Sequence, residues 1–294
     1  MATQQAARLT RGDDAVEEIY YRKGDIDFCF LLNRRHHNLR VFDYRVGNYQ
    51  QKRDFFDRIA RAEGLRKVFT VVEKQDSKSW RSVGFSREGA IPGYFRTADA
   101  YIMSRVYTEE GEPIQGGAPK LNPPALPSLT VKEKQITKPR GLTSELVTDI
   151  TRLESITREL GLESCYAPFR RGVFNPDVGL FARLGRRDLW VGAETDASFG
   201  HAKVDMITRP GKEADLPVLE YCLKVLLEEL ARNETASVFA VCAADDLLSN
   251  QAYGELGFKV TARLTDHLTR DDEFVGAQVW HRRLSPSSAQ RLAG

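Results

Sequence analysis

The sequence predicts a mixed α/β (α+β) protein in which two domains, each built on a mixed β-sheet, repeat one order of elements. Three observations support this prediction. The chain has 294 residues, which is long enough for two domains. A proline-rich segment divides it near the middle. The segments on either side both read strand, strand, helix, strand, helix, Gly-Phe, strand, strand.

The composition narrows the class of partners. Hydrophobic residues make up 41% of the chain and charged residues 29%, as in proteins with a packed core. A formal net charge of +2 predicts no strong field, so neither a nucleic acid nor a membrane is expected as a partner. No stretch reaches the roughly 20 apolar residues of a membrane span, and the first residues lack an apolar signal region. A cytoplasmic protein is therefore expected.

The proline-rich segment sets the predicted domain boundaries. Residues 111–142 contain six of the twelve prolines, few large apolar side chains and no sustained periodicity. Such a segment buries too little surface to offset its ordering entropy. We therefore expect a first domain over residues 1–110, a linker over 111–142 and a second domain over 143–294.

The first segment alternates short apolar runs with two helical patterns. Residues 27–32 and 39–46 are rich in aromatic and β-branched side chains, which favour strands. Phe55, Phe56 and Ile59 share one helical face, and Gly64 is a suitable stop for that helix. The remaining predicted elements are a buried strand at 67–72, a short helix ending at Gly84 and strands near 86–92 and 99–107.

The second segment repeats that order and adds a helix at its front. Leu219, Cys222, Leu223 and Leu226 recur at helical spacing, which predicts an amphipathic helix over residues 216–232. The other predicted elements are strands at 188–196 and 200–210, a buried strand at 236–243, a short helix ending at Gly257 and two closing strands. A capping box at Thr143 or Ser144 predicts an extra helix over 143–161.

Two motifs carry a resemblance to a known family. In the first segment, Gly84-Phe85 precedes EGAIPGY (residues 88–94) and DAYIMSR (residues 99–105). This combination resembles the N-terminal part of the β-lysine N-acetyltransferase family. The second segment is similar to that family's C-terminal domain, through a short helix with Asn250 and Tyr253, Gly257-Phe258, and a last strand with Trp280.

The resemblance implies the GNAT acetyltransferase fold in both domains, with a shortened copy at the N-terminus that is not catalytic. In this fold acetyl-CoA, a co-substrate, enters between two splayed strands, and its pyrophosphate meets the N-terminus of the next helix. The family marks that place with a glycine-containing loop, here residues 208–217. The predicted cofactor-binding residues are Ile207, Arg209, Gly211, Lys212, Ala214 and Asn250. Glu213 and Asp215 place negative charge at the same position.

The resemblance also implies the catalytic groups. The family uses a tyrosine of the short helix to protonate the leaving thiolate, and Tyr253 stands four residues before Gly257, at that position. Packing against the sheet is the alternative for Tyr253. Glu194 is the candidate general base and Asp205 its competitor, because both acids fall in predicted strands. Trp80 holds the tyrosine position in the first segment, and an indole cannot donate a proton in this way.

Other polar residues favour structural roles. Asn250 either bonds the cofactor's pantetheine arm or caps its helix. His201 and His267 fit a sheet core better than a catalytic base, and His36-His37 has too few neighbouring ligands for a metal, so no metal is expected. Two hypotheses remain. One is an acetyl-CoA-dependent N-acetyltransferase acting on a small-molecule amine or amino acid such as β-lysine, with a homodimer left open. The other is a GNAT-derived interaction or regulatory protein with a degenerate CoA site.

Overall fold

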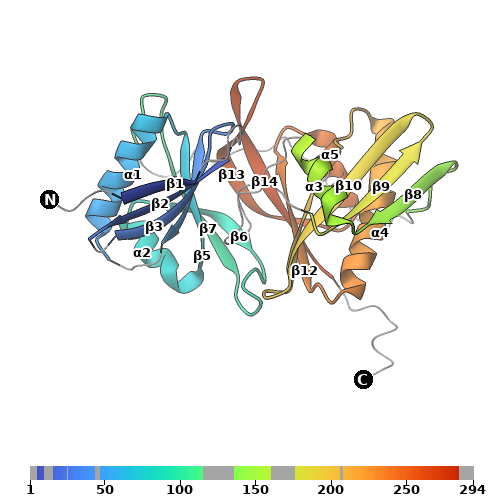
Figure 1. Ribbon diagram of the computed structural model, residues 1–294, viewed down its shortest axis with the longest axis horizontal. Coiled ribbons are helices and arrows are strands. Elements are labelled where there is room, and N and C mark those ends of the chain that lie inside the picture. The colour runs from blue at the N-terminus through green and yellow to red at the C-terminus, as the bar shows by residue number, and fades with distance from the viewer. Residues whose placement is uncertain are drawn as a thin grey trace.

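The computed structural model describes residues 5–9, 16–24, 26–43, 47–114, 136–159, 176–205 and 208–284. Their fourteen strands form one mixed sheet in the order β1-β2-β3-β4-β5-β7-β6-β13-β14-β12-β11-β10-β9-β8. The strands β1–β7 and β8–β14 make up a first and a second half, which lie side by side and meet where β6 neighbours β13 (Figure 1). This arrangement confirms the predicted mixed α/β fold.

The elements of the first half follow the predicted order, with two additional strands at the front. Its elements are β1 (Gln5–Leu9), β2 (Val16–Lys23), β3 (Ile26–Asn33), β4 (Asn38–Asp43), α1 (Tyr49–Glu63), β5 (Lys67–Glu73), a 3-10 turn (Lys74–Asp76), α2 (Ser77–Ser82), β6 (Ser86–Ile91) and β7 (Ala100–Val106). Helix α1 ends at Gly64, whose φ of 61° is the left-handed conformation that glycine adopts at low cost.

The second half has the same elements and one more helix. Its elements are β8 (Leu142–Val147), α3 (Ile150–Glu159), β9 (Val178–Leu184), β10 (Arg187–Asp196), β11 (His201–Asp205), a 3-10 turn (Glu213–Asp215), α4 (Leu216–Arg232), β12 (Ser237–Ala243), α5 (Leu247–Glu255), β13 (Lys259–Arg270) and β14 (Glu273–Arg283). In each half the strand before the long helix pairs in parallel with the strand after it, β4 with β5 and β11 with β12.

The front of the second half differs from the prediction. Residues 142–147 form strand β8, which pairs antiparallel with β9, and the helix begins only at Ile150. The capping-box pattern was misleading because Thr143 and Ser144 lie within the strand. The carboxylate that caps α3 belongs to Asp149, which accepts a hydrogen bond from the Arg152 N–H at 3.2 Å. Leu153 of α3 is buried against β9.

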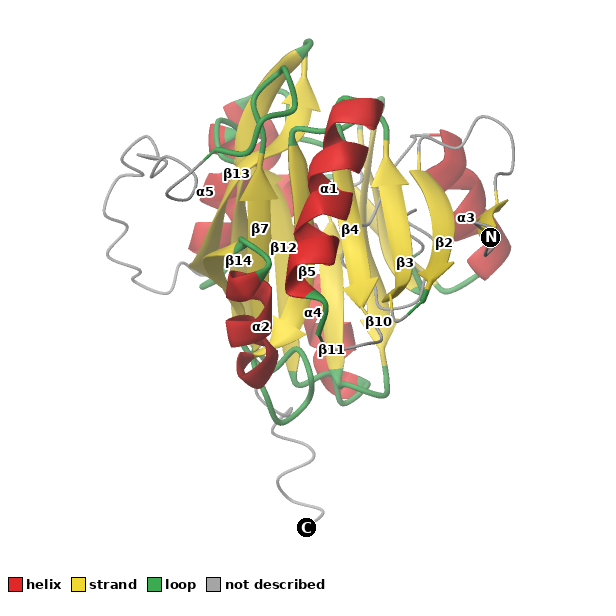
Figure 2. Cartoon of the chain, turned by 90° about the vertical axis from the view of Figure 1, so that its left-hand side faces the viewer, coloured by secondary structure: helices red, strands yellow, loops and turns green. Residues whose placement is uncertain are grey.

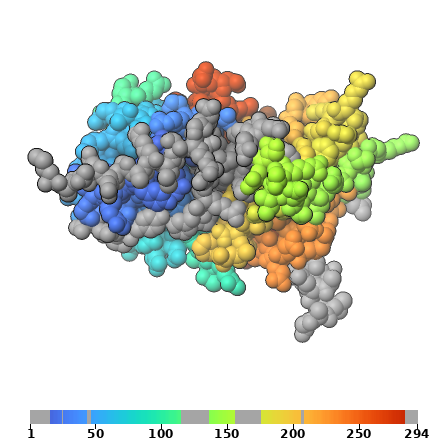
Figure 3. Space-filling model, viewed as in Figure 1, coloured from blue at the N-terminus to red at the C-terminus, as the bar shows by residue number. Residues whose placement is uncertain are grey.

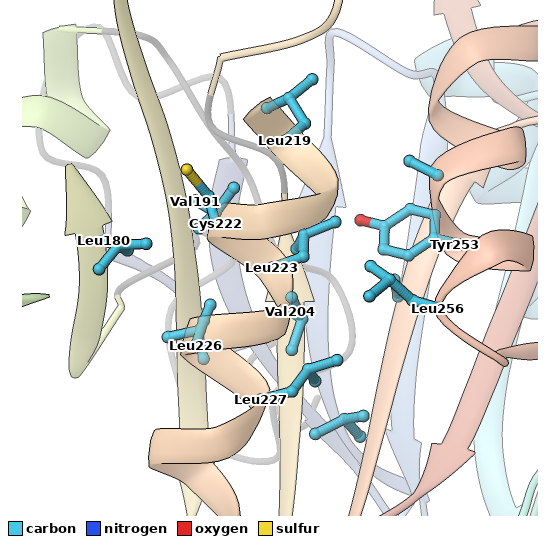
Figure 4. Packing of buried hydrophobic residues seen from close by; sticks show 14 of the residues in the cluster. Leu180, Val191, Val204, Leu219, Cys222, Leu223, Leu226, Leu227, Tyr253 and Leu256 are labelled. Atoms are coloured by element: carbon cyan, nitrogen blue, oxygen red, sulfur yellow. The ribbon is translucent and has the colours of Figure 1, made fainter. Parts of the chain in front are cut away.

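The helices α1, α2, α4 and α5 cover the outer faces of the sheet, whereas α3 packs on the opposite face of β9, where Leu153 meets Gly179. The inner faces of the two halves meet. One core packs α1 and α2 on the first half, and a second packs α4 and α5 on the second half (Figures 2 and 4). A third core lies between the halves, and it draws residues from β5–β7 and β12–β14, among them Phe69, Ile102, Phe239 and Val279. Burying one such side chain contributes about 1.5–3 kcal/mol, so this shared core joins the halves firmly.

The seam between the halves is a close backbone contact with a buried ion pair beside it. Gly89 of β6 pairs with Ala262 of β13, and a Cβ added at Gly89 would lie 2.2 Å from the Ala262 Cβ. Only glycine therefore fits here. Lys67 and Glu88 are both buried, with 2.7 Å between the Lys67 Nζ and Glu88 Oε2 atoms. In Figure 3 the turn between β13 and β14 projects above this seam.

Two histidines near the contact between the halves, the half-buried His36 and the buried His201, are expected to lower the stability of the fold in mild acid. Burial is the main cause that lowers the pKa of His36 and of His201 to about 4, from 6.5. A histidine with a lowered folded-state pKa is protonated first in the unfolded chain. The stabilisation that the neutral histidine gives the folded state is therefore complete above pH 6.5, and it is lost as the pH falls from 6.5 through 4. We expect the free energy of unfolding to fall by roughly 1 kcal/mol for each of the two histidines at pH 5.5.

Urea unfolding at pH 7.5 and 5.5 measures this effect. The His36→Gln variant keeps an acceptor for the Thr269 N–H, which donates to the His36 Nδ1 at 2.9 Å, and removes the titrating ring. Its free energy of unfolding should depend less on pH than that of the wild type. An equal slope in both proteins would contradict the assignment.

Candidate functional site

A wedge opens between the two parallel strands of each half. Strands β11 and β12 pair only at His201–Ser237, Ala202–Val238 and Lys203–Phe239, although both strands continue further. Strands β4 and β5 pair only from Asn38–Lys67 to Arg40–Phe69 and then separate in the same way. The predicted splay is therefore present twice, once in each half.

The wedge of the second half is narrow. A cavity of about 20 Å³ is lined there by residues of β11, β12, α5 and the loop before α4: Asp205, Arg209, Val241, Cys242, Ala243, Asp246, Ser249 and Tyr253. In Figure 4 the Tyr253 hydroxyl points from α5 toward α4. The sequence-predicted Tyr253 and Arg209 thus meet at one place, together with Asp205.

Tyr253 is suited to holding a proton. Its side chain is 2% exposed. Burial first, and then the charge of Asp205, raise the pKa of Tyr253 well above 10. A phenol in this environment stays protonated at neutral pH, so it can act as a proton donor but not as a base.

Glu194, the other predicted catalytic residue, lies elsewhere. Its neighbour Ala193 packs in the core under α4, and because side chains alternate along a strand, Glu194 points to the opposite, inner face of β10. There its charge acts on Tyr94 of the first half. Among the described residues, Asp205 rather than Glu194 shares a cavity with Tyr253.

In the loop predicted to hold a pyrophosphate, backbone N–H groups are hydrogen-bonded to a side chain of the protein. The Asp215 carboxylate accepts hydrogen bonds from the backbone N–H groups of Gly211 at 3.0 Å and Lys212 at 3.3 Å. It also forms a two-point ion pair with Arg187, which is the main cause that lowers the pKa of Asp215. Pro217 in the first turn of α4 removes another donor. The donors that an anionic ligand would use are therefore engaged by the protein.

The other residues predicted to bind the cofactor differ in how exposed they are. Arg209 and Ala214 are exposed, whereas Ile207 lies outside the described residues. Asn250 is buried and makes its hydrogen bonds within the protein. Its amide nitrogen donates to the carbonyls of Ala243 at 2.9 Å and Asp246 at 2.8 Å. Its Oδ1 accepts from the Trp280 Nε1 at 2.7 Å. Asp246 is the residue that caps α5.

The histidines flagged in the sequence occupy packed positions. His201 stacks on Tyr94 with 4.3 Å between ring centroids, and His267 meets Phe69 edge-on at 5.0 Å. The Nδ1 of His37 lies 3.1 Å from the Gly64 carbonyl. Within the described ranges, no group of three or more histidine, cysteine, aspartate or glutamate side chains could hold a metal ion.

The wedge of the first half is wider, which the sequence did not indicate. A cavity of about 360 Å³ lies between β4 and β5 and reaches α1 and α2. Trp80, the counterpart of Tyr253, forms part of its wall. We call this space the first-half cavity.

Comparison with known proteins gives matches among solved structures only. No family model matches the sequence, and no curated protein does. The ribosomal-protein-S18-alanine N-acetyltransferase of Escherichia coli is 12% identical and covers 49% of this chain and 95% of its own, with a TM-score of 0.37. A GNAT superfamily phosphinothricin acetyltransferase of Sinorhizobium meliloti, in complex with AcCoA, is 14% identical (51% and 91% covered; TM-score 0.38). A GNAT-family acetyltransferase of Streptococcus pneumoniae is 9% identical (49% and 99% covered; TM-score 0.38).

Each of these structures corresponds to about half of the present chain, and what they bind or modify is a property of those proteins. Their TM-scores lie below 0.5. Among the described helices, none is long and apolar enough to cross a membrane.

Proposed function

We propose that the protein is an acetyl-CoA-dependent N-acetyltransferase that acts on a small amine or amino acid in the wedge of its second half. The single observation that carries this proposal is the convergence of Tyr253, Asp205 and Arg209 on the cavity where β11 and β12 separate. An acid that keeps its proton, a carboxylate and a cation are the groups that acyl transfer to an amine requires.

The roles follow from the chemistry of the transfer. Asp205 accepts a proton from the acceptor ammonium, and the free amine then attacks the thioester carbonyl. The carbon–nitrogen bond forms as the carbon–sulfur bond breaks, and Tyr253 donates its proton to the departing thiolate. The second proton, which the nitrogen loses as it becomes an amide, restores the Tyr253 phenol. Arg209, exposed at the mouth, supplies positive charge for the phosphates of the co-substrate.

The acceptor is proposed from the sequence motifs alone. The EGAIPGY and DAYIMSR stretches make β-lysine the first acceptor to assay. A diamine with a carboxylate needs acidic partners for its ammonium groups and a cation for its carboxylate. Asp205 and Asp246 line the second-half cavity and are the acidic residues that such an acceptor would meet there.

Calorimetric titration with acetyl-CoA tests the proposal. Val241 lines the second-half cavity, and Val71, its counterpart in β5, lines the first-half cavity. We expect the wild type and Val71→Phe to bind acetyl-CoA and Val241→Phe to lose binding, with thermal unfolding as the check that both variants fold. Absence of binding at millimolar acetyl-CoA would overturn the proposal. Loss of binding in Val71→Phe alone would move the co-substrate to the first half.

The second candidate is a non-catalytic protein with a degenerate CoA site, and one observation favours it. The Asp215 carboxylate accepts hydrogen bonds from the Gly211 and Lys212 N–H groups, which would otherwise bind a pyrophosphate. Under this hypothesis acetyl-CoA fails to bind the wild type, and the chain instead serves as an interaction or regulatory module.

A further inference from the structure

We propose that the first-half cavity is a second binding site, which takes a small molecule with an aromatic or apolar body and one anionic group. This inference goes beyond the proposed acetyl transfer. The first-half cavity has a volume of about 360 Å³, which falls within the roughly 300–1,000 Å³ of small-molecule pockets. The second-half cavity has a volume of about 20 Å³.

The first-half cavity exists because β4 and β5 stop pairing with each other before either strand ends. After the Arg40–Phe69 pair, β4 continues to Asp43 and β5 to Glu73 without pairing to each other. The Thr70 hydroxyl donates to the Val41 carbonyl at 2.8 Å, which satisfies one backbone group at the narrow end. The space beyond is wide enough for a ligand to lie between the strands.

Aromatic and aliphatic side chains make up most of its walls. Trp80 lies on one side, and its indole is larger and less polar than the Tyr253 phenol of the second half. Two phenylalanines, one from each half, meet at the cavity: Phe95 and Phe199, with 5.7 Å between ring centroids. The site is therefore complete only when both halves are present. The other apolar wall residues are Val41, Phe42, Val71, Val72 and Val83.

The two most deeply buried charges that line the cavity belong to cations, Arg40 and Lys52. Arg40 is 2% exposed; its guanidinium stacks over the Phe42 ring at 4.6 Å and bonds the Tyr94 hydroxyl. Lys52 is also 2% exposed and is paired with Asp43. The other acids on the wall, Glu73 and Asp76, are half-buried and exposed, respectively, where water screens them.

The start of α1 adds to this positive environment. Asn48, the N-cap residue of α1, makes no capping hydrogen bond with its side chain, and the first turn of α1 contains no acidic residue. Gly47 and Tyr49 at this helix end line the cavity. In the second half the equivalent loop is closed by Asp215. Because free N–H groups at a helix start favour negative charge, an anionic group is the expected complement.

The first experiment uses 8-anilino-1-naphthalenesulfonate, a fluorescent aromatic anion, as the probe. We expect one molecule to bind per chain with enhanced fluorescence. Its neutral analogue N-phenyl-1-naphthylamine, which lacks the sulfonate, should bind at least tenfold more weakly. Equal affinity for the two probes would overturn the anionic requirement, and no saturable binding of the sulfonate would overturn the site.

Two pairs of variants locate the probe. Val71→Phe should abolish its binding, while the matched Val241→Phe in the other wedge should preserve it. Phe199→Glu places a negative charge at the cavity from a turn of the second half, outside the first-half core, and should weaken binding at least tenfold. Phe199→Leu should leave it within about twofold. Binding unaffected by both Val71→Phe and Phe199→Glu would contradict the location.

The outcome is separable from that of the proposed function. If the sulfonate binds the first-half cavity and acetyl-CoA binds nothing, the second site stands while the transferase proposal fails. If acetyl-CoA binds the second-half wedge and the sulfonate does not bind, the reverse holds.

Discussion

Replacing Tyr253 with phenylalanine is expected to lower the turnover number for acetyl transfer by about 10²- to 10⁴-fold, the range lost with a general acid. The substitution keeps the ring that packs against Phe258 and Trp280, at centroid distances of 5.3 and 6.3 Å, and removes only the hydroxyl. Since the raised pKa of Tyr253 keeps the phenol protonated, its loss removes a proton source rather than a base. Steady-state kinetics with acetyl-CoA and an amine measure the change.

Binding separates a role in transfer from a role in packing. Acetyl-CoA should bind Tyr253→Phe within a few-fold of the wild type, because the lost proton matters when the thiolate leaves. Tyr221→Phe makes the same chemical change on α4 and serves as the matched control, with turnover unchanged. An unchanged rate in Tyr253→Phe would remove this residue from the mechanism and leave the fold assignment intact.

Replacing Lys67 with methionine is expected to destabilise the fold by about 3–5 kcal/mol, the typical cost of removing one partner of a buried ion pair. The Lys67 Nζ contacts Glu88 and also donates to the Thr265 carbonyl at 2.9 Å. Glu88 in turn accepts from the Thr265 N–H at 2.9 Å. The substitution leaves the Glu88 carboxylate buried without its cation. Urea unfolding monitored by circular dichroism measures the free energy of unfolding.

A double variant identifies the cause of that loss. Lys67→Met combined with Glu88→Gln removes the uncompensated charge and keeps an acceptor for the Thr265 N–H. We expect it to recover at least half of the stability lost in the single variant. A single-variant loss below about 1 kcal/mol would mean that water reaches the pair, contrary to its burial.

Local patterns in the sequence were sufficient for most elements. The leucine spacing of residues 216–232 predicted α4 with its observed bounds, and Gly64 marked the end of α1. The strands β1, β2, β8 and β9 were missed. They lie toward the outer edges of the sheet, and β2 and β8 carry several exposed positions, so the apolar alternation that marks a strand is weak there.

The candidate site was less accessible to sequence reasoning. Tyr253 could be located because its spacing to Gly257 is local. The position of Glu194 depended on which face of β10 turns toward α4, and that is decided by long-range packing. Asp215 was noted as an unfavourable charge, but its bonds to Gly211 and Arg187 require a loop geometry that no pattern encodes. The first-half cavity depends on where two strands stop pairing.

The core shared between the inner faces of the halves has a consequence for assembly. Residues such as Ile102 and Val279 bury against the opposite half, as subunits of a symmetric dimer bury against each other. Here both partners belong to one chain, so their association is intramolecular. Dilution cannot separate the halves, and the contact of Phe95 with Phe199 persists at any protein concentration.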